Sequence, residues 1–217
     1  MVINGSFIDL SAIAKMMAYN GGSALPASDS KPTGRIIQNG QLLDGPSEPD
    51  RFYFAQTVCG EDSFGTGKGD PPPASCFGMG GLAPILMNGL PFGTTNRYRS
   101  DVPAGAPVTG SVGAKYLPYL TQKSNAMFAG MQGSGATGGK TAIGFSRSKH
   151  CLLVLVQQAG EHGLTAADYG AFFAKVKAEN AVFLDGSDSA TLYYDGNFLV
   201  TPGRAKNNFL TVAIGFK

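Results

Sequence analysis

The sequence predicts an α+β fold, with a mixed, largely antiparallel sheet, several hairpins and one or two packed helices. Glycine accounts for 31 of the 217 residues and proline for 13, and both residues disfavour helix interiors. Apolar runs flank tight-turn dipeptides, which is the pattern of β-hairpins. Hydrophobic residues make up 43% of the chain and charged residues 15%, a composition that supports a packed core rather than a disordered tail.

The N-terminal half predicts short strands and one helix. Residues 1–8 form an expected strand that ends at Asn4-Gly5. Residues 10–19 predict two or three helical turns, with Ser11 as the N-cap. The segment RFYFAQTV (51–58) predicts one further strand inside a stretch dense in Gly, Pro, Ser and Asp.

Three dipeptides that favour type I′ turns lie between apolar runs and predict hairpins. Asn-Gly and Asp-Gly suit this turn because they tolerate positive φ at both central positions. The hairpins are expected at 34–45 on Asn39-Gly40, at 82–93 on Asn88-Gly89 and at 191–201 on Asp195-Gly196.

The last third of the chain is more regular. Residues 141–158 predict two strands joined at 147–149, and residues 164–180 predict a helix. Thr165 followed by Asp168 approximates a capping box. The expected apolar face of this helix consists of Tyr169, Phe172, Phe173 and Val176. Two more strands are expected at 181–185 and 209–216.

The length predicts a single domain over 1–217, with a Gly/Pro-rich loop region at about 45–135. The N-terminal sequence MVINGSFID lacks a basic segment followed by a long apolar stretch, so no secretory signal is expected. A short chain of this kind would suit a module of a larger polypeptide.

Charge and hydropathy exclude two classes of partner. The net charge is +2, from 17 Lys and Arg against 15 Asp and Glu, and the basic residues are scattered. Nucleic-acid binding therefore has no electrostatic support. The longest apolar run, 151–156, is far too short to span a bilayer, so no membrane insertion is expected.

Three cysteines cannot all pair within one chain. Cys151 lies in an apolar strand and is expected to be a small buried side chain. Cys59 and Cys76 either pair as a disulfide, which needs an oxidising compartment, or remain free. No pair has C-x-x-C spacing, so no zinc site is expected.

Two polar segments follow expected strands and are candidates for a site. Asp185 comes at the end of an apolar strand, before the small polar loop 186–189. Such strand ends are rigid and commonly carry function. The alternative is an Asx-type turn in which the Asp185 carboxylate bonds nearby backbone N–H groups. Asn4-Gly5 likewise forms either a simple turn or a ligand contact.

Several catalytic motifs are missing. GGKTAIG (138–144) lacks the P-loop spacing, because Ser134 stands where the first glycine is needed. His150 and His162 are isolated, which favours structural or surface roles. The zincin motif H-E-x-x-H and the nucleophile elbow G-x-S-x-G are both absent from the sequence.

Taken together, the segments NGSFID, GGKTAIG, LDGSDSATL and the closing TVAIGF resemble the phosphodiester glycosidase family. The resemblance spans nearly the whole chain, is most specific in 138–215 and is thin in 45–130. It also has departures. Lys140 stands where the family has Arg, Ser6 and Ile8 where it has Gly and Phe, and Ser187-Asp188 where it has two glycines.

The resemblance implies a hydrolase that cleaves the glycosidic bond of a sugar-1-phosphodiester, either GlcNAc-1-phosphate-like or a bacterial sugar-phosphate polymer, and acts outside the cytoplasm. Asp185 would stabilise the oxocarbenium-like sugar or activate water, with Asn4 and Lys140 as its catalytic partners. No cofactor and no metal are implied. The substrate-binding residues implied are Gly5, Thr141, Gly186, Ser187, Ser189 and Arg204. Either Lys140 or Arg204 would supply the positive charge that holds the phosphate.

Two other functions are also consistent with the sequence. The substitutions in the 186–188 loop would also suit a non-catalytic module that binds a carbohydrate or another partner. The same fold would also suit a toxin or phage-encoded domain that acts on a bacterial glycan or a nucleotide-sugar.

Overall fold

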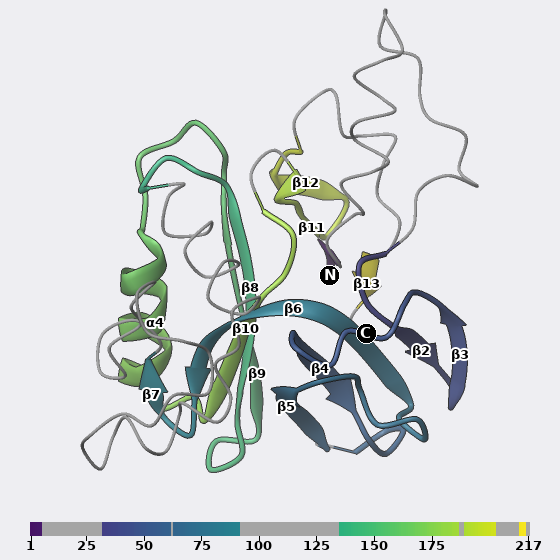
Figure 1. Ribbon diagram of the computed structural model, residues 1–217. Coiled ribbons are helices and arrows are strands. Elements are labelled where there is room, and N and C mark those ends of the chain that lie inside the picture. The colour runs from purple at the N-terminus through teal and green to yellow at the C-terminus, as the bar shows by residue number, and fades with distance from the viewer. Residues whose placement is uncertain (6–31, 62, 92–134, 187–188, 203–212, 216–217) are drawn as a thin grey trace, which may run out of the picture.

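The computed structural model describes residues 1–5, 32–61, 63–91, 135–186, 189–202 and 213–215. These residues form two sheets and one α-helix (Figure 1), and every strand pair in them is antiparallel. The largely antiparallel sheet is confirmed. The described part of the chain is mostly β, with less helix than the α+β prediction suggests.

The larger sheet has nine strands. They are β2 (Ile36–Gln38), β3 (Gln41–Asp44), β4 (Phe52–Gln56), β5 (Phe64–Lys68), β6 (Phe77–Met87), β7 (Leu90–Pro91), β8 (Lys140–Ser146), β9 (Cys151–Gln157) and β10 (Asn180–Phe183). The main path follows the order β3-β2-β6-β10-β8-β9, while β4 and β7 pair with β6, and β5 pairs with β4.

Strand β6 is long and curved, and it links the two halves of this sheet (Figure 1). Its first residues pair with β2 and β4, and its later residues pair with β10. Gly81 within β6 has a φ of +75°, and a Cβ on Gly34 would lie 2.2 Å from the Gly81 nitrogen. Only glycine permits this approach of two backbones.

The sequence prediction missed part of this sheet for that reason. The glycine-rich segments of β5 and of the first half of β6 were expected to be loops within 45–135, and the structure shows strands there. In β6 the glycine serves close packing: a Cβ on Gly78 would lie 2.7 Å from the Pro71 side chain.

The smaller sheet joins the two ends of the chain. Its strands are β1 (Val2–Asn4), β11 (Leu192–Tyr194), β12 (Asn197–Val200) and β13 (Ala213–Gly215), in the order β12-β11-β1-β13. Ile3 pairs with both Ile214 and Leu192 and is fully buried. The N-terminal strand is therefore fixed by C-terminal segments.

Helix α4 (Ala166–Lys175) begins with the predicted capping box. Thr165 Oγ1 accepts from the backbone N–H of Asp168, and Asp168 Oδ2 accepts from the backbone N–H of Thr165 at 2.8 Å. The Thr165 hydroxyl also donates to Asp168 Oδ2 at 2.6 Å, and this bond, together with the one from the Thr165 backbone N–H, holds the pKa of the Asp168 carboxyl below its usual value.

The apolar face of α4 is shifted from the predicted one. The side chain of Phe172 is 37% exposed, so its place in the expected face is wrong. The buried positions keep the helical spacing but begin at Ala166 instead, because Gly170 rather than Phe172 lies against the sheet, where a Cβ would meet Pro91 at 2.9 Å. They are Ala166, Tyr169, Gly170 and Phe173.

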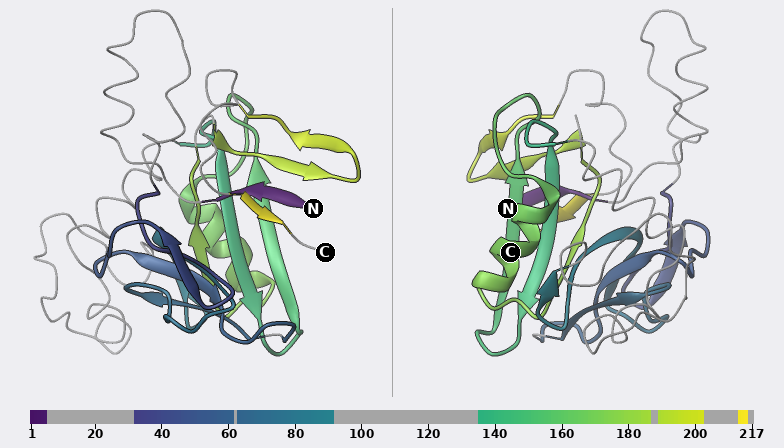
Figure 2. Two further views of the ribbon diagram at one scale, coloured as in Figure 1. Left: turned by 90° about the vertical axis from the view of Figure 1, so that its right-hand side faces the viewer. Right: turned by 60° about the vertical axis from the view of Figure 1, so that its left-hand side comes forward.

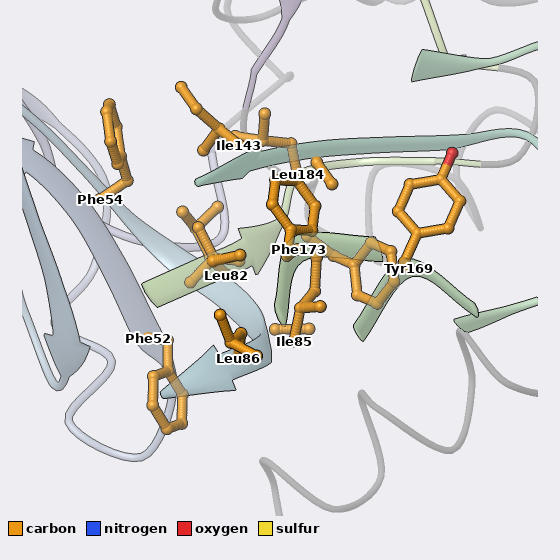
Figure 3. Close-up of a cluster of buried hydrophobic side chains, with 14 of the residues drawn as sticks. Phe52, Phe54, Leu82, Ile85, Leu86, Ile143, Tyr169, Phe173 and Leu184 are labelled. Carbon is orange, nitrogen blue, oxygen red and sulfur yellow. The ribbon is translucent and has the colours of Figure 1, made fainter. Parts of the chain in front are cut away.

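The core lies between α4 and the two halves of the larger sheet (Figure 3). Tyr169 and Phe173 of the helix lie beside Ile85 of β6, while Phe52 and Phe54 of β4 occupy the far side of the cluster. The Tyr169 ring also packs against Phe183, with ring centroids 5.4 Å apart. Burial of the hydroxyl raises the pKa of Tyr169 well above its usual value.

The turns and the disulfide agree with the sequence patterns. Each of the three predicted turn pairs has positive φ at both residues, from 47° at Asp195 to 78° at Gly196, so the hairpins are confirmed. Cys59 and Cys76 are disulfide-bonded. Cys151 is free and half-buried, and so more exposed than expected, because β9 is the last strand on the main path of the sheet and is partly exposed along its whole length.

Some expectations fall outside the described residues. These are the helix at 10–19, the loop-rich stretch over 100–134 and most of the strand at 209–216.

Substitution of Gly144 by alanine should loosen the contact between α4 and the sheet. The new Cβ would lie 2.8 Å from the Phe173 ring and 3.0 Å from the Cβ of Ala181. We expect Gly144→Ala to lower the free energy of unfolding by about 1–3 kcal/mol. Gly65→Ala is the control, because no heavy atom lies within 4 Å of a Cβ there. Urea unfolding of both variants is the measurement, and equal stability of the two would contradict the packing described.

Candidate functional site

The ends of several strands meet at one edge of the molecule. Strands β8 and β10 are antiparallel, with Ala142 opposite Phe183, so the start of β8 lies beside the end of β10. The ladder continues one step further, since the Leu184 N–H donates to the Thr141 carbonyl at 2.9 Å. The end of β1 reaches the same place, because Asn4 bonds to both Thr141 and Asp185.

The buried side chain of Asn4 connects these strand ends. Its Nδ2 donates to the backbone carbonyl of Asp185 at 2.7 Å. Its Oδ1 accepts from Thr141 Oγ1 at 2.6 Å and from the Thr191 N–H at 3.0 Å. We refer to Asn4, Gly5, Thr141, Asp185 and Thr191 as the Asn4 network. The amide of Asn4 therefore holds Asp185 in position.

Asp185 is fixed on both sides of its backbone. Its carbonyl accepts from Asn4, and its N–H donates to the Gly5 carbonyl at 3.0 Å. The carboxylate is half-buried, and its Oδ1 accepts from the Gly186 N–H at 2.8 Å. This bond from the Gly186 N–H is the local contact expected if Asp185 only forms an Asx-type turn. The two long-range backbone bonds add a constraint that a simple surface turn would not need.

The loop after Asp185 returns directly to the Asn4 network. The Ser189 N–H donates to the Gly186 carbonyl at 3.0 Å, and Thr191 Oγ1 donates to the Ser189 carbonyl at 2.9 Å. The Ser189 hydroxyl is buried, and in the described part of the chain it has no hydrogen-bond partner.

Lys140 points away from this network. Neighbouring residues of a strand face opposite sides, and Thr141 faces Asn4. The Lys140 ammonium instead donates to the carbonyls of Gly135 at 2.6 Å and Gly138 at 2.9 Å, and the side chain is fully buried. Burial lowers the pKa of Lys140, and the negative charge of Asp168 partly offsets that effect.

The structure thus brings most of the predicted site residues together. Asn4, Gly5, Thr141, Asp185, Gly186 and Ser189 share one set of contacts. Lys140 is adjacent in sequence but bonds on the other face of β8. Ser187 and Arg204 lie outside the described residues.

Sequence analysis missed two residues of this region. Thr191 is a full member of the Asn4 network, and its place in LDGSDSATL was the available indication. Gln157 pairs with Lys140 across β8 and β9, and its Nε2 also donates to the Gly138 carbonyl at 2.8 Å. Nothing in its local sequence indicated this role.

A cavity of about 320 Å³ lies elsewhere, at the opposite end of β8, and none of the predicted site residues lines it. Its lining includes Glu61, Phe64, Arg147, His150 and Cys151.

The described ranges contain no cluster of three or more His, Cys, Asp or Glu side chains suited to a metal ion. Their helix α4 is too short to be a membrane-spanning segment.

A family model described as phosphodiester glycosidase matches residues 3–217. The chain belongs to the phosphodiester glycosidase family. That match covers the whole network, from Asn4 to Thr191.

Two solved structures resemble this family member. One is the zebrafish N-acetylglucosamine-1-phosphodiester alpha-N-acetylglucosaminidase catalytic domain, auto-inhibited by pro-peptide, at 17% identity and a TM-score of 0.51 over 93% of this chain and 55% of that chain. The other is a hypothetical protein from Synechocystis, at 12% identity and a TM-score of 0.45 over 93% of this chain and 48% of that chain. This chain therefore spans about half the length of each. No curated protein matches it.

Removal of the Thr141 hydroxyl should weaken the network of this glycosidase-family chain. Thr141→Val keeps the shape of the side chain but leaves Asn4 Oδ1 with one partner fewer. We expect the free energy of unfolding to fall by about 1–3 kcal/mol. In Thr66→Val, the matched control, the lost hydroxyl is buried and has no partner among the described residues, so stability should stay the same or rise. An equal loss in both variants by urea unfolding would refute the contribution of the Thr141 bond.

Proposed function

We propose that this chain is a hydrolase that cleaves the glycosidic bond of a sugar-1-phosphodiester. The observation that carries the proposal is the fixation of Asp185, whose backbone N–H and carbonyl are both bonded to residues at the far end of the sequence. A carboxylate held by a rigid scaffold at a strand end is preorganised for catalysis. Membership of the phosphodiester glycosidase family supports the same reaction class.

In the proposed reaction, the bond between the anomeric carbon and the phosphate oxygen breaks. Phosphate leaves with the bonding electrons, so a strong general acid is less necessary than in an ordinary glycosidase. The ionised carboxylate of Asp185 stabilises the positive charge that develops on the sugar ring, or takes a proton from the attacking water. Water supplies the new hydroxyl at the anomeric carbon, and the products are a free sugar and a phosphomonoester.

The residues around Asp185 divide into two roles in this proposal. Asn4 and Thr141 position Asp185, because their polar side-chain atoms are engaged within the protein. Gly5, Gly186 and the buried hydroxyl of Ser189 contact the substrate, together with Ser187. Hydroxyls such as those of Ser187 and Ser189 stabilise anionic oxygens. No cofactor is assigned to the reaction.

The first substrate to test is a diester of N-acetylglucosamine-1-phosphate. We choose it because the zebrafish protein is named as an N-acetylglucosamine-1-phosphodiester alpha-N-acetylglucosaminidase. A bacterial sugar-phosphate polymer is the second substrate class, since the sugar is not specified by the contacts described.

A binding module without catalytic activity is the competing function. The three hydrogen bonds that engage the buried Asn4 amide within the protein favour it, because they are not offered to a substrate. The two functions differ in one result, which is turnover of a sugar phosphodiester by the wild-type protein.

Replacement of the Asp185 carboxylate should abolish most turnover while leaving the fold intact. Asp185→Asn keeps an oxygen that can accept from the Gly186 N–H but removes the charge. We expect kcat to fall on the order of 100-fold, with little change in ground-state binding. Steady-state hydrolysis and thermal melting together are the measurement.

The chain offers a closely matched control for that experiment. The Gly45 N–H donates to Asp44 Oδ1 at 2.7 Å, which is the same Asp-Gly contact on the exposed strand β3. Asp44→Asn should therefore leave kcat unchanged. An unaltered kcat in Asp185→Asn would remove Asp185 from the mechanism, and no turnover by the wild type would favour the binding module.

The cation that holds the phosphate is a separate question with its own test. The resemblance points to Lys140 or Arg204, and the Lys140 ammonium is held by two carbonyls on the face of β8 away from Thr141. We therefore assign the phosphate contact to Arg204. Arg204→Met should raise KM about tenfold or more, whereas Lys140→Met should change thermal stability and leave KM within about twofold. The reverse pattern would assign the phosphate contact to Lys140 instead.

A further inference from the structure

The register of the smaller sheet places two aromatic side chains on β11 and β12, the next two strands across the sheet from β1, which carries Asn4. Val2 pairs with Tyr193 on the neighbouring strand, and Tyr193 pairs with Phe198 on the next. Residues directly opposite each other in antiparallel strands share one face of the sheet. The rings of Tyr193 and Phe198 confirm this arrangement, with centroids 5.1 Å apart and an angle of 67° between their planes.

At the β11–β12 hairpin this face of the sheet is turned away from the core, whereas further along β1 it carries the fully buried Asn4. Ile3, Ile214 and Val200 on the opposite face are buried. By contrast, the Tyr193 side chain is 37% exposed and the Phe198 side chain is 57% exposed. In Figure 2 the β11–β12 hairpin that carries both rings projects from the rest of the molecule. We call Tyr193 and Phe198 the aromatic platform.

The aromatic platform is continuous with the Asn4 network. Asn4 lies two residues after Val2 in β1, so both side chains are on the platform's face, about 7 Å apart along the strand. Thr191 of the network likewise lies two residues before Tyr193. Phe198 is two strands away from β1, a further shift of about 10 Å across the sheet. The distance from the site to the rings is on the scale of a disaccharide.

We propose that the aromatic platform binds sugar residues of the substrate that lie beyond the scissile bond. The face of a pyranose ring carries C–H groups with partial positive charge, and these pack well on the electron-rich face of an aromatic ring. The Tyr193 hydroxyl adds a group that can bond a sugar hydroxyl. The substrate would then be an oligosaccharide or polymer joined through phosphate. This inference rests on the proposed function for its placement of the scissile bond at Asp185.

The kinetic test compares a short substrate with a long one. The probes are N-acetylglucosamine-1-phosphate esters of methanol and of chitotriose. Phe198→Ala and Tyr193→Ala should each raise KM about tenfold for the chitotriose ester. Both variants should leave KM for the methyl ester and kcat for both esters within about twofold. Tyr194→Ala is the matched control, since this 55% exposed tyrosine is adjacent to Tyr193 and faces the other side of the hairpin.

A binding test works even if neither ester is hydrolysed. The chain contains no tryptophan, so Phe198→Trp provides a single tryptophan on the aromatic platform, whose emission can be excited selectively. Its emission should change on titration with chitotriose or maltotriose at millimolar concentrations, whereas the emission of Tyr194→Trp should not. Sedimentation of the wild type and of Phe198→Ala measures whether this face instead joins two copies of the chain.

The outcomes separate the two proposals. A fluorescence response without hydrolysis of any ester would retain the aromatic platform and refute the proposed function. Hydrolysis of both esters with no effect of Phe198→Ala, and no fluorescence response, would refute the platform and retain the function. A wild-type dimer that Phe198→Ala dissociates would assign this face to a second copy of the chain and overturn the sugar proposal.

Discussion

The buried amide of Asn4 is the interaction on which the arrangement of the site depends. Its three hydrogen bonds join β1 of the smaller sheet to Thr141 of the larger sheet and to the Asp185 and Thr191 segment between them. In a water-excluded position such a group must be fully bonded, because an unpaired buried donor or acceptor is costly. This requirement brings three distant segments of the chain to one place and fixes the backbone that carries the carboxylate of Asp185.

The glycine content supports the same arrangement through packing. Strand β6 bends from one half of the larger sheet to the other where Gly34 and Gly81 meet backbone to backbone, and α4 approaches β8 where Gly144 meets the ring of Phe173. Side chains at these positions would push the layers apart. The scaffold therefore holds the ends of β8 and β10 in a fixed relation, and the Asn4 network forms across them. Preorganisation of the site begins with these close contacts.

Local chemistry made part of this fold predictable from sequence. Asn39-Gly40 and the Thr165–Asp168 box each determine a turn or a helix start within four residues, so the sequence pattern was sufficient. The strand at β5 was missed because its sequence, FGTGK, contains two glycines, a residue type that is depleted in strands. For the candidate site, the strand ends indicated Asn4 and Asp185. The face of β8 on which the Lys140 side chain lies depends on the register in which β8 pairs with β10. The sequence does not reveal that register.

If the Asn4 network positions Asp185 for catalysis, Thr141 and Asp185 must act as one unit. The most direct measurement is a double-mutant cycle on kcat for an N-acetylglucosamine-1-phosphodiester, with Thr141→Val, Asp185→Asn and the double variant. If Thr141 acts through Asp185, Thr141→Val lowers kcat about tenfold in the wild-type background and has no further effect once the carboxylate is gone. The same loss in both backgrounds would show that the two residues act independently and would contradict the account.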